Sequence, residues 1–139
     1  MTTSRSRKLF INLPVSDIKR SVAFFTKLGF SFNAQFAGES NACMIMSEEA
    51  YVMLLEEKRF KDFTKKQICD TKTSTEALFS FACASRAEVD ELVKTAIAAG
   101  GSTADDPQDH GFMYDWGFYD PDGHGWGVFY MDPGATPPK

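Results

Sequence analysis

The sequence has few cysteines, few histidines and no long apolar segment. Its three cysteines, Cys43, Cys69 and Cys83, form no CxxC pair, which indicates buried or idle thiols in a reducing compartment. No stretch approaches the roughly 18 apolar residues of a membrane span, and the first residues lack the apolar core of a signal peptide. We therefore expect a cytoplasmic protein with no membrane partner.

Several sequence motifs are also absent. The chain has no phosphate-binding glycine loop and no GxSxG, HExxH or CxxC motif, so nothing points to a nucleotide site or to a serine nucleophile. The formal net charge is −4 at pH 7, and this acidic balance argues against a nucleic-acid partner.

The chain is rich in apolar side chains. Hydrophobic residues make up 43% of its 139 residues and 13 are phenylalanine, which is enough for the core of one domain or of two small modules. We expect part of the phenylalanine to line a cavity or to be buried between two copies of the chain, and hence a homodimer.

The first half of the chain predicts a strand, a helix and three further strands. Residues 8–15 alternate in part, as a strand does. Ser16 and Asp17 resemble a helix N-cap followed by an acidic residue, and apolar residues then recur at helical spacing until Gly29 ends the helix. Polar turns separate the three strands expected next, at residues 30–36, 41–46 and 51–55.

The second half predicts the same order. A strand is expected at residues 77–84, and the capping box Ser85-Arg86-Ala87-Glu88 predicts a helix that ends at Gly100-Gly101. Further strands are expected at residues 102–105, 111–119 and 124–131. We therefore predict a single α+β domain, residues 1–139, made of two βαβββ modules at 8–57 and 77–131. Residues 58–76 join them as a linker with a short helix.

Four segments of the chain resemble a known family: Phe10–Asp17, Ser21–Phe30, Ala98–Gly101 and Phe118–His124. They are similar to the vicinal oxygen chelate superfamily, which includes glyoxalase I, extradiol dioxygenases, and fosfomycin and bleomycin resistance proteins. Residues 107–114 and 126–132 resemble, more narrowly, a bacterial branch often labelled lactoylglutathione lyase-like. The resemblance implies two βαβββ modules that form a curved mixed sheet around a cleft, the glyoxalase/bleomycin resistance/dihydroxybiphenyl dioxygenase-like fold.

The resemblance also implies where a metal would bind. The four ligand positions of the family fall on Phe10, on Met53 or Leu54, on Leu78 and on Gly127. Hard and borderline divalent cations need several nitrogen or oxygen donors, and none of these side chains offers one. We therefore expect no metal and no other cofactor.

The same positions and their neighbours are candidate ligand-binding residues. Asn12 shares a strand face with Phe10, and Phe129 shares one with Gly127, where glycine leaves room for a ligand. Aromatic residues alternate along residues 112–119, and the sequence leaves open which face of that strand lines the cleft. The candidates are Phe10, Asn12, Met53, Leu78, Tyr114, Gly127 and Phe129.

Two functions fit this pattern. The first is the binding of a small organic molecule in an apolar cleft, without the family's usual metal. The alternative is a lyase or isomerase similar to lactoylglutathione lyase, or a dioxygenase-like enzyme, acting on an oxygenated small molecule. The catalytic residues stay unknown at this stage, and Glu56 and His110 are the candidate bases, His110 with a neighbouring aspartate. His124 is expected to be a hydrogen-bonded residue at the entry of a strand.

Overall fold

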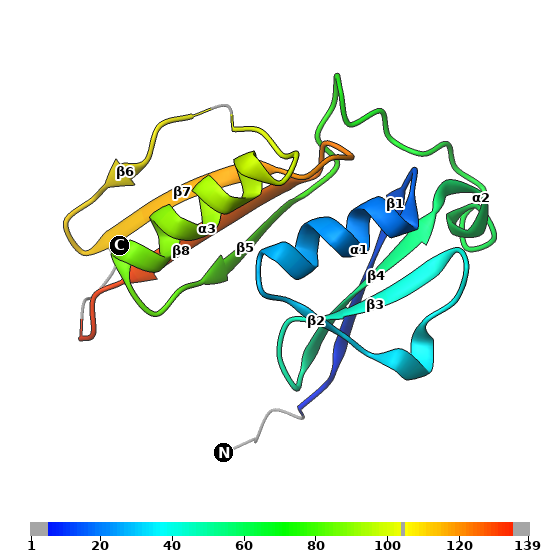
Figure 1. The fold of residues 1–139 in the computed structure, drawn as a ribbon, viewed down its shortest axis with the longest axis horizontal. Coiled ribbons are helices and arrows are strands. Elements are labelled where there is room, and N and C mark those ends of the chain that lie inside the picture. The colour runs from blue at the N-terminus through cyan, green and yellow to red at the C-terminus, as the bar shows by residue number, and fades with distance from the viewer. Residues whose placement is uncertain (1–5, 104, 135–139) are drawn as a thin grey trace, which may run out of the picture. The chain divides into compact units, whose positions relative to one another are not determined.

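The computed structural model describes residues 6–103 and 105–134 and divides into two compact units, Met1–Ile68 and Cys69–Lys139. Each unit carries one four-stranded mixed sheet with helices packed on it (Figure 1). The α+β class and the βαβββ order of each module are confirmed. The division between the units falls inside the predicted linker 58–76, while the description of the chain as a single domain stays a prediction.

Unit 1 contains one sheet with the strand order β1-β4-β3-β2. Strand β1 pairs in parallel with β4, and the other pairs are antiparallel. In chain order the elements are β1 (Leu9–Val15), α1 (Ile18–Lys27), β2 (Ser31–Phe32), the 3-10 helix η1 (Ala34–Phe36), β3 (Asn41–Ile45), β4 (Ala50–Glu56) and α2 (Glu57–Phe60).

The predicted strand 30–36 is wrong in its second half. Only Ser31 and Phe32 pair with β3. The Oδ1 atom of Asn33 accepts a hydrogen bond from the Gln35 N–H at 3.0 Å, and this side-chain cap starts η1 in place of further pairing.

Helix α1 forms where the sequence predicts it, but its N-cap is Asp17 and not Ser16, so no acidic residue lies in its first turn. The Asp17 carboxylate caps it by accepting hydrogen bonds from the N–H groups of Lys19 and Arg20. Phe24 and Phe25 of this helix are buried, so its apolar stripe contributes to the core of unit 1. Gly29, at a φ of 99°, ends the helix in a conformation that favours glycine.

Unit 2 contains the second sheet, with the strand order β5-β8-β7-β6. Strand β5 pairs in parallel with β8, and the remaining pairs are antiparallel. Its elements are β5 (Leu78–Ala82), α3 (Arg86–Ala98), β6 (Gln108–Asp109), β7 (Met113–Tyr119) and β8 (Gly125–Met131).

The predicted strand 102–105 is also wrong, and residue 104 lies outside the described residues. Only Ser102 forms an isolated bridge, to Tyr119, and the edge strand is β6 instead. The Thr103 hydroxyl donates to the carbonyl oxygen of Gly117 at 2.9 Å, so a side chain takes the bond that a neighbouring strand would make.

Helix α3 begins with the predicted capping box. The Oγ atom of Ser85 accepts a hydrogen bond from the Glu88 N–H, and the Glu88 carboxylate accepts one from the Ala84 N–H. Val89, Val93 and Ala96 are buried. With 13 residues α3 is the longest helix described, and none of the described helices combines the length and apolar character that a bilayer crossing requires.

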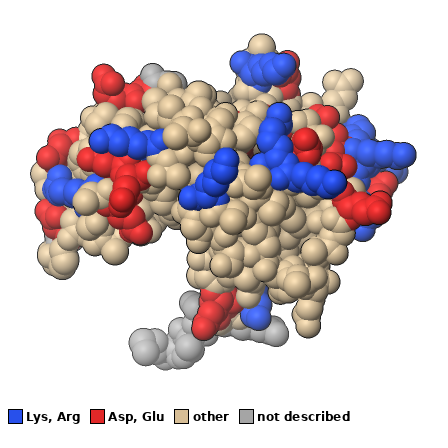
Figure 2. Space-filling view, in the orientation of Figure 1, with Lys and Arg blue, Asp and Glu red and all other residues tan. Residues whose placement is uncertain are grey.

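Positive and negative charges are separated along the chain. Figure 2 shows Lys and Arg side chains gathered over α2 and the residues that follow it, a segment that contains Lys58, Arg59, Lys61, Lys65 and Lys66. Residues 105–115 have no Lys or Arg and include Asp105, Asp106, Asp109 and Asp115. The segment that borders the second sheet is therefore locally acidic.

Candidate functional site

The two faces of the second sheet differ in what covers them. Helix α3 packs on β7 and β8, and the Tyr114 hydroxyl donates a hydrogen bond of 2.5 Å to Asp90 of that helix. Phe118 and Trp126, which pair across the two strands, are buried. The aromatic row of residues 112–118 thus faces the helix. The alternate row, with Asp115, Gly117 and Tyr119, lies on the opposite face, which we call the open face.

The open face carries a hollow of about 220 Å³. Three strands of the sheet contribute to its lining, together with Thr103, Asp105, Asp106 and Gln108. The lining residues that the strands place on the open face are Leu78, Ser80, Asp115, Gly117, Tyr119, Gly125 and Gly127.

Two glycines of β8 form the floor of the hollow. A Cβ atom on Gly127 would lie 2.7 Å from the Oγ atom of Ser80, and one on Gly125 would lie 2.9 Å from a methyl carbon of Leu78. Glycine at these positions therefore lets the side chains of β5 lie across β8. The space expected above Gly127 is partly taken by Ser80, a residue that the sequence did not single out.

A histidine and an aspartate are paired beside the hollow. The Nε2 atom of His110 lies 2.9 Å from the Oδ2 atom of Asp115, and both side chains are more than a third exposed. Asp115 lines the hollow, so the pair is next to any molecule bound there. A histidine held by a carboxylate is a common acid–base arrangement. The partner expected from the sequence, the adjacent Asp109, is instead bound to Arg86.

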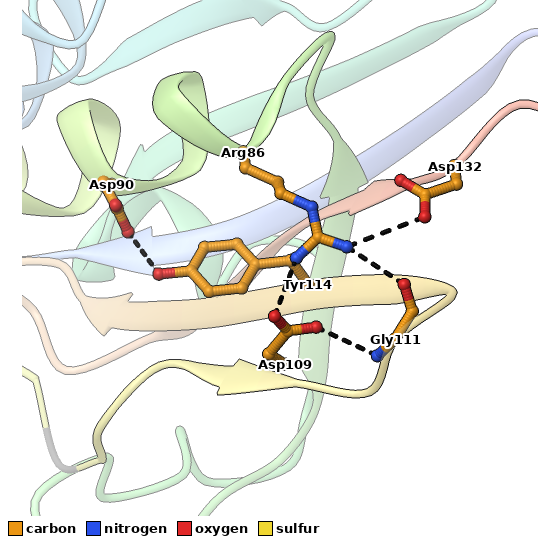
Figure 3. A network of polar contacts seen from close by, with 6 residues as sticks. All are labelled: Arg86, Asp90, Asp109, Gly111, Tyr114 and Asp132. Carbon is orange, nitrogen blue, oxygen red and sulfur yellow. Dashed lines mark hydrogen bonds and ion pairs between the residues drawn. The ribbon is translucent and has the colours of Figure 1, made fainter.

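Arg86 ties the loop that carries His110 to helix α3. Figure 3 shows its guanidinium between Asp109, Asp132 and the carbonyl of Gly111, at 3.1, 3.6 and 3.0 Å. The group also lies 5.6 Å from the centre of the Tyr114 ring. Asp109 and Gly111 flank His110, so Arg86 binds the side chain of the residue before the histidine and the backbone of the residue after it.

Hydrogen bonds in this network shift the pKa values of its members. The pKa of Asp109 is lowered, first by the hydrogen bond from the Gly111 N–H and then by the one from Arg86. The pKa of Arg86 is raised, chiefly by its hydrogen bond to Asp109. The hydrogen bond to Asp90, followed by burial, raises the pKa of Tyr114 to about 12, so this hydroxyl stays protonated near neutral pH.

In the first sheet, the predicted residues Phe10, Asn12 and Met53 share one face. Asn12 is paired with Met53, and Phe10 stacks on Tyr51 with ring centres 4.8 Å apart. Leu54 is fully buried on the opposite face, so Met53 is the one of the two alternatives that lies with Phe10.

Glu56, a candidate base, has a structural contact at the start of α1. Its Oε2 atom accepts a hydrogen bond of 2.9 Å from the Ile18 N–H. A carboxylate is stabilised at the positive end of a helix.

His124 is buried, and its backbone N–H donates a hydrogen bond to the Asp120 carboxylate in the turn before β8. This contact is the one expected for a residue at the entry of a strand.

The residues at the positions that the resemblance assigned to a metal do not fit a divalent cation. Phe10 and Met53 in the first sheet, and Leu78 and Gly127 in the second, provide no nitrogen or oxygen donor. Within residues 6–103 and 105–134, no three His, Cys, Asp or Glu side chains are grouped so as to hold a metal ion. We derive no chemistry through a metal at these positions.

The structure brings some predicted residues together and separates others. Leu78, Gly127 and Phe129 share the open face, where Phe129 borders a second hollow beside Asp115. Tyr114 faces α3 instead. Ser80, Asp115 and Tyr119 were not singled out, although the alternation of β7 already placed Asp115 and Tyr119 on one face.

Comparisons with known proteins agree with this architecture. A sequence model of the Glyoxalase/Bleomycin resistance protein/Dioxygenase superfamily matches residues 9–128. A comparison with curated proteins finds no significant match. Among solved structures, a hypothetical protein from S. aureus is similar with 25% identity and a TM-score of 0.77, over 94% of this chain and 96% of that one.

Two further solved structures show the same fold at lower identity. A glyoxalase-related enzyme from Fulvimarina pelagi has 16% identity and a TM-score of 0.78, covering 91% of this chain and 88% of its own. A genomically encoded fosfomycin resistance protein from Listeria monocytogenes has 19% identity and a TM-score of 0.64, covering 96% of this chain and 97% of its own.

Proposed function

Since the chain belongs to the Glyoxalase/Bleomycin resistance protein/Dioxygenase superfamily, we propose that it binds a small organic molecule on the open face of its second sheet, without the family's usual metal. The observation that carries the proposal is the hollow of about 220 Å³. Small-molecule sites are concave and combine apolar surface with a few polar groups. Leu78 and Tyr119 supply the apolar surface of this hollow, and Ser80 and Asp115 supply polar groups.

The metal-free part of the proposal rests on the donor set. A cation at the positions that the resemblance assigns to the family's metal would lie among Phe10, Met53, Leu78 and Gly127, whose side chains have no oxygen or nitrogen atom. Binding therefore depends on apolar contact, on hydrogen bonds from the hollow and on its charge.

The proposal includes the assembly and location of the protein. Leu9 is 55% exposed and Phe10 is 44% exposed, and burying such side chains favours a homodimer. A cytoplasmic location fits the free cysteines Cys43, Cys69 and Cys83.

The test is a thermal-shift screen of small aromatic and thiol-conjugate compounds, run with a chelator and again with divalent ions. A ligand that binds only the folded chain raises Tm by mass action. We expect at least one compound to raise Tm equally under both conditions. Stoichiometric metal in protein purified without chelator, together with a Tm shift that chelation removes, would contradict metal-free binding.

A matched pair of variants locates the site. Ser80→Leu extends a side chain from β5 into the hollow above Gly127 and should remove the ligand-induced Tm shift. Ser31→Leu, at an exposed position of β2 in unit 1, is the control and should keep the full shift. A Ser80→Leu variant that folds and retains the shift would place the ligand elsewhere.

A second candidate function, a lyase- or isomerase-like activity, is favoured by the pairing of His110 with Asp115 at 2.9 Å. In this case His110 takes a proton from the bound molecule or returns one to it. Every compound that raises Tm is incubated with the protein and analysed for conversion. If His110→Ala forms no product but keeps the Tm shift, the result would support an enzymatic function in which His110 is the base. If the wild-type protein leaves every binding compound unchanged, an activity on these compounds is excluded.

A further inference from the structure

We propose that the hollow selects an organic cation, a small molecule in which a protonated amine or quaternary ammonium group is attached to an apolar or aromatic body. This inference rests on the proposed function, because it names the class of ligand that the open face takes. It follows from the charge of the lining, from its exposed apolar side chains and from the way in which the acidic segment is held.

The lining is negatively charged. Asp105, Asp106 and Asp115 all line the hollow, and none of its described lining residues is Lys, Arg or His. Carboxylates around a concave, partly desolvated surface attract cations and disfavour anions. A thiol conjugate that carries several carboxylates of its own would be repelled by this lining.

The hollow also has apolar surface next to the carboxylates. Tyr119 is 36% exposed and Leu78 is 74% exposed, and both lie beside Gly125 on the floor. A cation over the face of a tyrosine ring is attracted by the negative face of the ring. A ligand with both a cationic and an apolar part can therefore contact the carboxylates and the apolar side chains at once. A metal ion or an inorganic ion would contact only the carboxylates.

The acidic segment is fixed to the sheet. The indole N–H of Trp116 donates to the carbonyl oxygen of Asp105 at 2.8 Å, and the Thr103 hydroxyl donates to the carbonyl oxygen of Gly117 at 2.9 Å. These two bonds hold Thr103 and the backbone of Asp105 alongside β7. Asp105 is thereby kept next to the hollow before a ligand binds, so less ordering is required when one does.

The experiment is an NMR titration of the full chain with three probes of similar size and different charge. The probes are benzyltrimethylammonium, benzyl alcohol and phenylacetate, and the backbone amide signals of Gly125 and Gly127 report binding in the hollow. At pH 8 and low salt we expect the cation to bind about tenfold more tightly than the alcohol, and phenylacetate to bind more weakly than either. Added salt should narrow these differences.

A charge-matched pair of variants completes the test. Asp105→Asn/Asp106→Asn should weaken binding of the cation about fivefold and leave that of benzyl alcohol unchanged. Asp62→Asn/Asp70→Asn removes the same formal charge from residues that do not line the hollow and should leave both affinities unchanged. Equal effects of the two double variants would overturn a local cation site.

The outcomes separate this inference from the proposed function. If the cation and the alcohol bind with equal affinity and both shift the signals of Gly125 and Gly127, the proposal of an organic cation would be wrong. The proposal that the hollow binds a small molecule would still hold. Absence of shifts at both glycines for all three probes and for the compounds found by thermal shift would overturn the proposed function as well.

Discussion

At the scale of single residues, the buried carboxylate of Asp120 accepts three hydrogen bonds. It is 5% exposed and accepts hydrogen bonds from the N–H groups of Asp122 and His124 and from the indole N–H of Trp126, at 2.9, 3.0 and 3.0 Å. Burial raises the pKa of Asp120, while nearby His124 and the hydrogen bonds act in the opposite direction. One side chain thus determines the geometry of the turn that leads into β8.

Replacing this carboxylate should be costly. Asp120→Ala leaves its three donors without their acceptor, and we expect the free energy of unfolding to fall by about 3 kcal/mol, measured by urea denaturation. Asp62→Ala removes a carboxylate that is exposed and paired with Arg59 at 3.1 Å, and should cost less than about 1 kcal/mol. Similar losses in the two variants would show that the turn does not depend on Asp120.

At the scale of elements, the loop between β6 and β7 depends on the first turn of α3. Arg86 lies in that turn and contacts Asp109 and Gly111 on either side of His110. The N–H of His110 in turn donates to the carbonyl of Met113 at 2.7 Å. The orientation of the His110–Asp115 pair is therefore set by a helix that contributes no residue to the hollow.

Arg86→Lys should loosen this loop. Lysine has a single point of charge and cannot reproduce the fork of a guanidinium group that reaches two or more acceptors at once. We expect the amide hydrogens of His110 and Gly111 to exchange severalfold faster, while the amides of the α3 core keep their protection. Arg59→Lys, in an exposed pair with Asp62, is the control. Unchanged exchange at both amides would show that Arg86 does not position the histidine.

At the scale of the whole molecule, two large apolar side chains lie exposed at the start of β1. Leu9 is 55% exposed and Phe10 44%. Side chains of this kind at the surface of a chain commonly mark an interface. Their exposure supports the proposed homodimer, because a second copy of the chain would remove them from water.

Light scattering coupled to gel filtration tests the assembly. The expected mass is twice that of the 15.5 kDa chain. Leu9→Ser/Phe10→Ser should lower the apparent mass toward that of one chain at micromolar concentration, because each change removes apolar area from the interface. Phe63→Ser, at a residue that is 65% exposed after α2, is the control. A wild-type chain with the mass of a monomer would contradict the homodimer.

The sequence by itself determined the features that depend on residues close in the chain. Asp17 and the capping box Ser85–Glu88 start the two main helices because each donor and acceptor lies within four residues. The alternation along β7 likewise assigned its side chains to two faces. The order of the elements and the superfamily follow from such local patterns.

Only the tertiary structure decided which groups meet across the chain. The packing of α3 determines that Tyr114 faces the helix and that Asp115 faces the hollow, because alternation defines two faces without saying which one is covered. In the same way His110 pairs with Asp115 across a strand pair instead of with its neighbour Asp109, and Glu56 binds the start of α1, 38 residues away. The contact of His110 depends on the register of β6 against β7, and that of Glu56 on packing over a long sequence separation; alternation along one strand encodes neither.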